Sequence, residues 1–449
     1  MFEYGIKRAK ELDVYFQSHG TPVGPLHGLP MSLKDSFKIP GYDSTIGLVE
    51  NIGNKSTEYS TLCQLLYDQG AVFYVKTNVS QCLMTYDSDN NVFGRVLNPL
   101  NLQLTAGGSS GGEGALLKQR GSVVGIGTDV GGSIRIPALC DGVYGFKPSC
   151  DRVPYGNQVN PDDPRDRTGL SFNPCAGPLA TTFDNLDIVF RAILGGKPWL
   201  YDASTKSVPF MDDVYNEFKN KEVLRIGYFI EDEGFPLHPP LKFAIEHSIE
   251  RLQKEGYEMV RIDKFPSLEI LWRHATRSYI MSFGFWTFCK IFRVGEPPIQ
   301  ALKGTHVEKF GLPPANSSVS RVQRYLLERE NLKLQWNTIF MELGLDAIIC
   351  PAAPHGPVKQ DEYGISPYTA MWNVVDFPAL VMPLTKEPAL TLENAPHKSE
   401  YVKGKYSAYV ADYKPEETVG ACSHIQLVTR NFEDEKLLAI SRRIDYILN

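Results

Sequence analysis

Apolar and polar positions repeat along this chain with two different periods, which predicts a succession of helices and strands. Helical spacing occupies residues 6–18, 59–69, 112–119, 182–194, 240–255 and 319–343, and the last of these is the longest. Short apolar runs typical of strands lie within residues 29–37, 71–75, 123–126, 224–230, 346–350 and 379–383. Because strands and helices alternate throughout, we expect an α/β fold with a large mixed central β-sheet covered by helices on both faces.

Three segments depart from this pattern. Residues 150–175 are rich in Asp, Pro, Asn and Arg and predict a surface loop, while residues 384–407 predict a mobile one. Residues 268–293 contain many aromatic side chains, which we interpret as core rather than as the wall of a binding channel. No internal repeat is evident, so we expect a single domain over residues 1–449.

Composition narrows the functional classes. The net charge of −6 gives no general attraction to nucleic acid. No run of about 18 apolar residues predicts a transmembrane segment, and the N-terminus lacks the order of a signal peptide. The eight cysteines are scattered, which favours reduced, buried thiols over a disulfide framework or a zinc site. We therefore expect a cytoplasmic protein that binds a small molecule.

The most informative segment is rich in glycine and runs from residue 107 to residue 137. Two serines, Ser109 and Ser133, each follow a Gly-Gly pair. A serine that attacks a carbonyl carbon needs an open approach and donors for the developing oxyanion. The backbone amides of Val130, Gly131, Gly132 and Ser133 are the natural donors, because the glycines allow a tight turn beside Ser133.

A nucleophilic serine also needs a base, and no histidine lies near this segment in the sequence. Lys34 lies among mostly apolar and small residues, where loss of hydration lowers the pKa of an ammonium group. A neutral Lys34 can accept a proton, and Ser109 can relay it from Ser133.

Other interpretations of the glycine-rich segment are weaker. It lacks the Gly-Lys-Ser/Thr ending of a phosphate-binding loop, and its glycines do not form the dinucleotide-binding pattern. Residues 107–111 formally match the nucleophile elbow of α/β-hydrolases, but no downstream Asp and His are marked for Ser109. No pattern predicts a metal or organic cofactor.

The chain resembles the amidase signature family, in the branch of fatty acid amide hydrolase and the fungal acetamidases. The matching pieces, in family order, are Gly28 to Asp35, Lys76 to Val79, Gly107 to Ala115, Gly125 to Ala138, Gly145 to Pro148, Gly177 to Ala180, Asp346 to Pro351 and Tyr368 to Asn373. The resemblance implies the amidase signature fold.

It also implies roles for individual residues. Ser133 would be the acylated nucleophile, Ser109 the bridging serine after a cis peptide bond, and Lys34 the base. The residues that would support this network are Ser110, Thr128, Asp129 and Arg135. Arg135 as a clamp for a substrate carboxylate is a minority interpretation. We also expect Leu83 and Ser109 to contact the substrate.

The implied reaction is hydrolysis of a carboxamide through an acyl-enzyme, with acetamidase-like activity (EC 3.5.1.4) as the main expectation. A glutamine-dependent amidotransferase subunit and a catalytically dead family member are the alternatives, and a homodimer is kept open.

The chain departs from the family pattern in three places. The resemblance implies more helical sequence before Lys34, so we expect a shortened N-terminal part. Lys118 stands where a small residue is usual, and residues 420–426 replace a Gly-Ala-Pro type of turn, with Cys422 and His424 at the changed positions.

Overall fold

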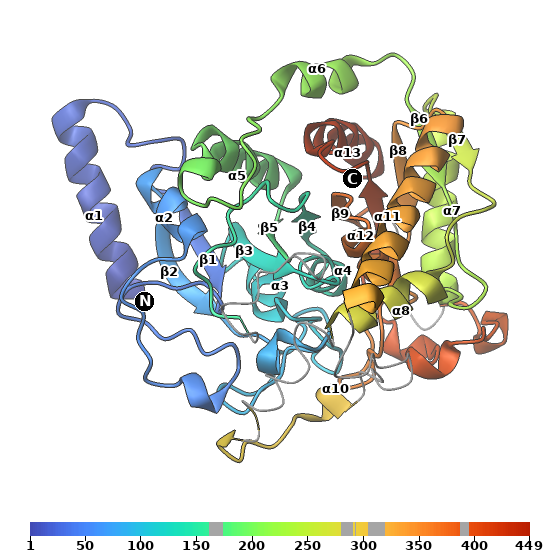
Figure 1. Ribbon diagram of the computed structural model, residues 1–449, viewed down its shortest axis with the longest axis horizontal. Coiled ribbons are helices and arrows are strands. Elements are labelled where there is room, and N and C mark those ends of the chain that lie inside the picture. Colours follow the sequence, from blue (N-terminus) through green and yellow to red (C-terminus); the bar gives the residue numbers. More distant parts are fainter. Residues whose placement is uncertain (161–173, 280–290, 292, 304–318, 387–394) are drawn as a thin grey trace.

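A mixed ten-stranded sheet forms the centre of the computed structural model, which describes residues 1–160, 174–279, 291, 293–303, 319–386 and 395–449 (Figure 1). Its strand order is β2-β1-β3-β5-β4-β9-β10-β8-β6-β7. The strands are β1 (Pro30–Lys34), β2 (Val72–Thr77), β3 (Val124–Asp129), β4 (Tyr144–Lys147), β5 (Cys175–Ala180), β6 (Arg225–Tyr228), β7 (Glu258–Arg261), β8 (Ala347–Cys350), β9 (Ala379–Leu384) and β10 (Ser423–Val428). β1 runs parallel to β2 and β3, whereas β5, β4, β9 and β10 pair antiparallel.

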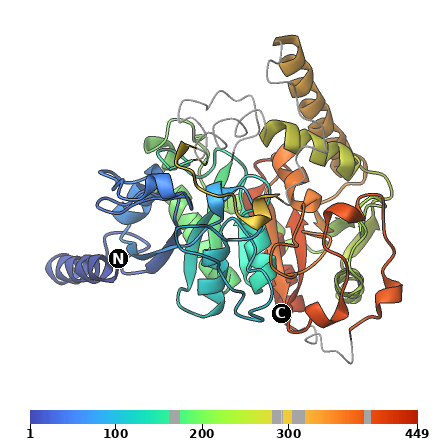
Figure 2. The ribbon, with the colours of Figure 1, turned by 90° about the horizontal axis from the view of Figure 1, so that it is seen from below.

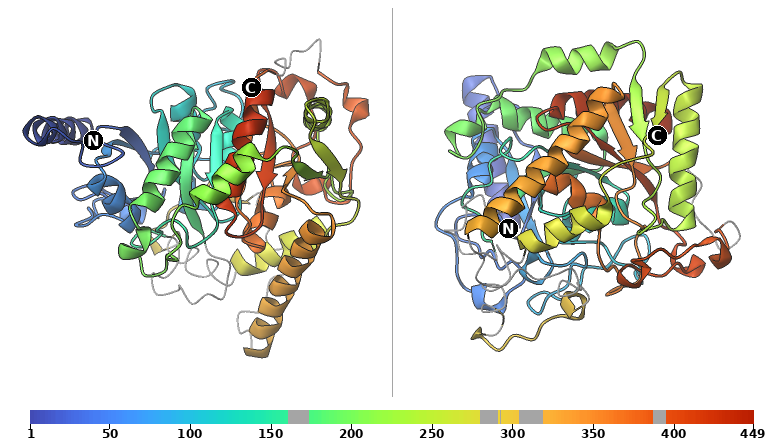
Figure 3. Two further views of the ribbon diagram at one scale, coloured as in Figure 1. Left: turned by 90° about the horizontal axis from the view of Figure 1, so that it is seen from above. Right: turned by 45° about the vertical axis from the view of Figure 1, so that its right-hand side comes forward.

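Helices surround this sheet. The α-helices of the described residues are α1 (Phe2–His19), α2 (Thr61–Asp68), α3 (Gly111–Lys118), α4 (Arg135–Asp141), α5 (Phe183–Gly195), α6 (Asp212–Asn220), α7 (Pro239–Lys254), α8 (Leu268–Tyr279), α10 (Gln300–Lys303), α11 (Val319–Glu342), α12 (Pro367–Val374) and α13 (Asp434–Leu448). α11 projects from the body (Figure 2), and α1 lies outside the edge strand β2 (Figure 3). None of the helices in the described part combines the length and apolar character that crossing a membrane requires.

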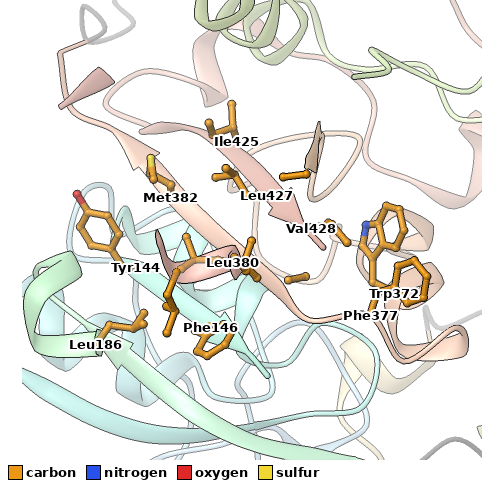
Figure 4. Close-up of a cluster of buried hydrophobic side chains, with 14 of the residues drawn as sticks. Tyr144, Phe146, Leu186, Trp372, Phe377, Leu380, Met382, Ile425, Leu427 and Val428 are labelled. Atoms are coloured by element: carbon orange, nitrogen blue, oxygen red, sulfur yellow. The ribbon is translucent and has the colours of Figure 1, made fainter. Parts of the chain in front are cut away.

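The core lies on both faces of the sheet, as the alternation of side chains along β9 makes clear. Leu380 and Met382 pack with Leu186 of α5 in the larger apolar cluster, which also contains side chains of α13 (Figure 4). Val381, on the opposite face, packs in a second cluster with side chains of α3 and α4. The expected mixed sheet with helices on both faces is therefore confirmed.

The loop predictions were less accurate. Residues 161–173 lie outside the described residues, but Arg152 is fully buried and pairs with Asp434 and Glu435 of α13. This part of residues 150–175 is therefore not a surface loop, and Cys175 already belongs to β5. Most of the aromatic segment after α8 and residues 387–394 of the predicted mobile loop also lie outside the described residues.

Candidate active site

The site begins at the carboxyl ends of two neighbouring parallel strands. β1 and β3 pair in parallel, with Ser32 opposite Gly125 and Leu33 opposite Ile126. Lys34 is the last residue of β1, and Thr128 lies near the end of β3. The register therefore brings the Lys34 side chain to Thr128, at the edge where open α/β sheets usually bind their ligands.

Lys34 is held by hydroxyls and one carbonyl rather than by a carboxylate. Its Nζ donates to Ser109 Oγ at 2.7 Å, to Thr128 Oγ1 at 2.7 Å and to the Thr128 carbonyl at 3.3 Å. The side chain is 0% exposed. Burial lowers the pKa of Lys34 to about 7, against the opposing influence of the charges of Asp129 and Glu113. An amine in this setting can hold or release a proton near neutral pH.

Ser109 precedes α3 and follows a cis peptide bond with Gly108, as the resemblance implied. The glycines around it allow close contact between backbones. A Cβ on Gly108 would lie 2.6 Å from the Thr85 carbonyl, and one on Gly112 would lie 2.5 Å from the Asn78 carbonyl. Side chains at these positions would therefore collide with neighbouring backbone.

Glu113 of α3 is a second buried ionisable group beside Lys34. Its carboxylate accepts hydrogen bonds from Ser32 and Thr77, each at 2.6 Å. Burial raises the pKa of Glu113 to about 7, although the two hydroxyl donors and the charge of Lys34 lower it. A negative charge on Glu113 in turn favours the protonated form of Lys34.

The turn from β3 to α4 is folded around the carboxylate of Asp129. This carboxylate accepts from the backbone amides of Gly132 at 2.8 Å and Ile134 at 3.2 Å, and from Arg135 Nε and Nη2 at 3.0 Å each. Burial alone would raise the pKa of Asp129, but the charge and hydrogen bonds of Arg135 and the Asn373 amide hold it well below its usual value. Asp129 therefore braces the turn as an anion.

Arg135 completes this network. Its guanidinium also donates to Gln426 Oε1 at 2.9 Å and to Asn373 Oδ1 at 2.6 Å, and the residue is fully buried. Because the guanidinium is fully buried and each of its nitrogens already donates inside the protein, the structure gives no support to the interpretation of Arg135 as a clamp for a substrate carboxylate.

Ser133 lies on this turn, 6% exposed, while Ser109 is 1% exposed. The Ser110 amide donates to the Ser133 carbonyl at 3.2 Å, which joins the start of α3 to the turn. Among the hydrogen bonds of the described residues, none joins the hydroxyls of Ser109 and Ser133. Lys34 and Ser109 are thus in direct contact, and Ser133 is the more exposed of the two serines.

The expected oxyanion donors differ in what they bind. The Gly132 amide donates to Asp129, so it is committed to the turn, and our expectation that it faces the oxyanion is corrected. No acceptor within the described residues is recorded for the amides of Val130, Gly131 and Ser133. Within the described residues, these three amides are therefore candidates for binding a ligand oxygen.

A model of the Amidase family matches residues 1–438. The chain belongs to this family. An "Amidase" of Gibberella moniliformis is 34% identical over 97% of this chain and 78% of its own length. An "Acetamidase" of Aspergillus oryzae is 32% identical over 99% of this chain and 82% of its own length. A solved structure titled "Fatty acid amide hydrolase" aligns with a TM-score of 0.89 at 29% identity, over 100% of this chain and 78% of that one. The Amidase-family protein described here is accordingly an enzyme that acts on amides.

Two of the residues that depart from the family pattern, Lys118 and Cys422, lie together beside Gly142, the residue that follows α4. Lys118 ends α3, and its charge lowers the pKa of both Asp141 and Cys422, although burial raises both values overall. A Cβ on Gly142 would lie 3.4 Å from Lys118 Nζ and 2.9 Å from Cys422 Cβ. His424, the third, is buried in β10 opposite Pro383.

Leu83 and Ser110 are placed differently from the other predicted site residues. Leu83 is half-buried and packs with the apolar cluster of Ile46, Leu48, Cys82 and Ile291. The Ser110 hydroxyl is buried and has no hydrogen-bond partner among the described residues, so its contribution to the network is through its backbone amide.

Sequence reasoning missed several members of the site of this Amidase-family protein. Glu113, Thr369 and Asn373 lie inside the segments that carried the family resemblance, so that resemblance was a signal for them. Tyr86 and Tyr279, which donate to backbone carbonyls of the turn, had no such signal.

Proposed function

We propose that this enzyme hydrolyses a carboxamide to a carboxylate and ammonia or an amine, with Ser133 as nucleophile, Ser109 as proton relay and Lys34 as base. The observation that carries the proposal is the 2.7 Å hydrogen bond from Lys34 Nζ to Ser109 Oγ, made by a fully buried lysine whose pKa is lowered to about 7. A buried, neutral amine next to a hydroxyl supports transfer of a proton through that hydroxyl.

The reaction would proceed in two halves. The Ser133 oxygen attacks the amide carbon, its proton passes to Ser109, and the proton of Ser109 passes to neutral Lys34. The amides of Val130, Gly131 and Ser133 stabilise the negative oxygen, since these three have no other acceptor in the described residues. The C–N bond breaks as the proton returns through Ser109 to the leaving nitrogen. Water then attacks the acyl-enzyme by the same relay and releases the carboxylate.

The assignment of Ser133 rather than Ser109 as nucleophile is supported by accessibility. Ser133 is the more exposed of the two, and the available amides belong to its own turn. Ser109 is already the partner of Lys34, which suits a relay. The α/β-hydrolase alternative, with Ser109 as nucleophile, lacks a histidine contact to Ser109 among the described residues.

The substrate class is proposed from the relatives' names. Curated relatives with more than 30% identity over nearly the whole chain are called amidase or acetamidase, so we propose a small acyl amide and an acetamidase-like activity. Leu83 and Ser109 remain our candidates for substrate contact. The cytoplasmic location and a homodimer remain predictions.

The test is to measure ammonia release from acetamide and longer acyl amides by the wild type and by Ser133→Ala, Ser109→Ala and Lys34→Ala. We expect Ser133→Ala to be inactive and unlabelled by a fluorophosphonate probe that labels the wild type. Labelling of the Ser133→Ala variant at Ser109 would show that Ser109, and not Ser133, is the nucleophile. A folded wild type that neither reacts nor labels would identify a dead family member, and strict dependence on glutamine plus a partner subunit would favour an amidotransferase.

A further inference from the structure

Two backbone carbonyls of the turn beside Ser133 each accept hydrogen bonds from side-chain hydroxyls. The Val130 carbonyl accepts from the Tyr279 hydroxyl at 3.1 Å. The Gly131 carbonyl accepts from Thr369 Oγ1 at 2.7 Å and from the Tyr86 hydroxyl at 3.1 Å. These donors come from three separate elements: the end of α8, the helix α12, and the loop after residue 83.

Holding a carbonyl also fixes the amide that shares its peptide plane. In a trans peptide the C=O and N–H bonds point to opposite sides of a rigid plane. The Gly131 carbonyl is held by Thr369 and Tyr86, and the Gly132 amide duly points the other way, to Asp129 at 2.8 Å. By the same geometry, Tyr279 fixes the Gly131 amide on the side away from its own hydroxyl. That amide has no acceptor in the described residues.

These contacts leave no room for a side chain at either glycine of the turn, and Gly132 also has a positive φ of 133°. A Cβ on Gly131 would lie 2.0 Å from the Tyr279 hydroxyl oxygen, and a Cβ on Gly132 would lie 2.4 Å from Thr369 Oγ1. Tyr279 and Thr369 therefore occupy the space that side chains would need. Gly131 is required by its neighbour Tyr279, and not by an unusual backbone angle, because its φ is not positive.

We propose that Tyr279 is a positioning residue, which holds the Gly131 amide in the direction that a developing oxyanion on the substrate requires. The inference rests on the proposed hydrolysis through Ser133. It deepens that proposal by making the end of α8 part of the apparatus that stabilises the transition state. Such preorganised donors act because they need not reorient when the charge forms.

The first experiment compares Tyr279→Phe with the wild type. Losing one oxyanion donor costs about 100- to 1000-fold in kcat, and a loosened donor should cost less, so we expect kcat to fall by about 10- to 100-fold. KM should stay within about threefold, since the donor acts in the transition state. The affinity for a trifluoromethyl ketone inhibitor, which forms an oxyanion on Ser133, should fall by the same factor as kcat. The pH profile should not move.

The matched control is Tyr325→Phe. The Tyr325 hydroxyl donates to the His274 carbonyl, also on α8, at 3.2 Å, so its loss removes a comparable bond from the same helix without touching the turn. We expect this variant to keep the wild-type kcat. Equal losses in both variants would assign the effect to the stability of α8 and overturn the proposal.

A second pair of variants tests the contact itself. Gly131→Ala should lower kcat further than Tyr279→Phe, because the new methyl group and the Tyr279 hydroxyl cannot share one place. Adding Tyr279→Phe to Gly131→Ala removes the closest atom and leaves the next ones at 3.1 Å, so kcat should partly recover. Additive losses would contradict the proposal. An inactive wild type would instead refute the proposed function, whereas an active wild type with unchanged kcat in Tyr279→Phe refutes only this inference.

Discussion

Lys34 and Arg135 are both cations with no exposed surface, and they differ in what surrounds them. Arg135 is hydrogen-bonded directly to the Asp129 carboxylate, and each of its partners accepts a hydrogen bond. Among the described residues, Lys34 Nζ donates only to hydroxyls and a carbonyl, while the nearby carboxylates of Asp129 and Glu113 act on it at longer range. Arg135 has an ion-pair partner in direct contact, whereas burial without such a partner lowers the pKa of Lys34 to about 7. Equal burial therefore accompanies a structural brace in one region and our proposed base in the other.

Lys34→Met should show the largest difference between the two regions, because it should lower activity without lowering stability. We expect activity to fall by about 100- to 10,000-fold, the range usual for loss of a general base. The free energy of unfolding should not fall, because burial of the protonated lysine destabilises the folded state, as its lowered pKa indicates. In the wild type this cost is complete below pH 7 and fades as the pH rises from about 7 toward 10.5, where the unfolded chain also loses the proton.

Urea unfolding at pH 6 and pH 9 checks this expectation. Lys34→Met should gain more free energy of unfolding, relative to the wild type, at pH 6 than at pH 9. A variant that unfolded at lower urea than the wild type at both pH values would contradict the role of Lys34 as a destabilising base.

Arg135→Met should give the opposite pattern of stability. Removing one partner of a buried pair leaves the other charge uncompensated and costs about 3–5 kcal/mol in the free energy of unfolding. The urea midpoint at pH 8 measures this loss, and activity should fall with the folded fraction and with disorder of the turn. A fully stable Arg135→Met would show that Asp129 is satisfied by its amide donors alone.

Glu113→Gln should have the smallest effect. Glu113 favours protonated Lys34, so its neutralisation should lower the pKa of Lys34 and move the acid limb of kcat/KM to lower pH. The ratio of activity at pH 6 to activity at pH 8.5 should rise by a few-fold. Glu222→Gln, at an exposed position, is the control and should leave the limb unchanged. A shift to higher pH would contradict this coupling.

The difference between the regions also explains how far the sequence could be read. Lys34, Ser109 and Ser133 could be chosen as candidates because a glycine-rich segment and an apolar strand mark them, and β1 appeared at its expected place. The network around Arg135 was less visible, since Gln426 lies far along the chain, outside the segments that matched the family, and its amide resembles any other polar group. Contacts of this kind are set by the strand order, which periodicity alone does not give.

The same limit applies to elements and loops. Residues 420–426 were predicted to be a changed turn, because Cys and His in this segment are not typical of a strand. Most of the segment instead belongs to β10, which pairs with β8 and β9 inside the sheet. The polar composition of residues 150–175 predicted a surface loop, whereas Arg152 is buried there and two acidic residues of α13 neutralise it in the interior. In both cases a polar residue was misjudged because its partner was unknown.

The complete burial of Lys34 behind Ser109 has one last consequence, for exchange with the surroundings. Within the described residues, the amine has no surface of its own through which buffer molecules could deliver or remove a proton. The proton taken from the attacking serine would thus stay inside the protein until it is transferred to the leaving nitrogen. In such an enzyme the same proton would move from the O–H bond of the serine to the N–H bond of the leaving group, without catalysis by dissolved bases.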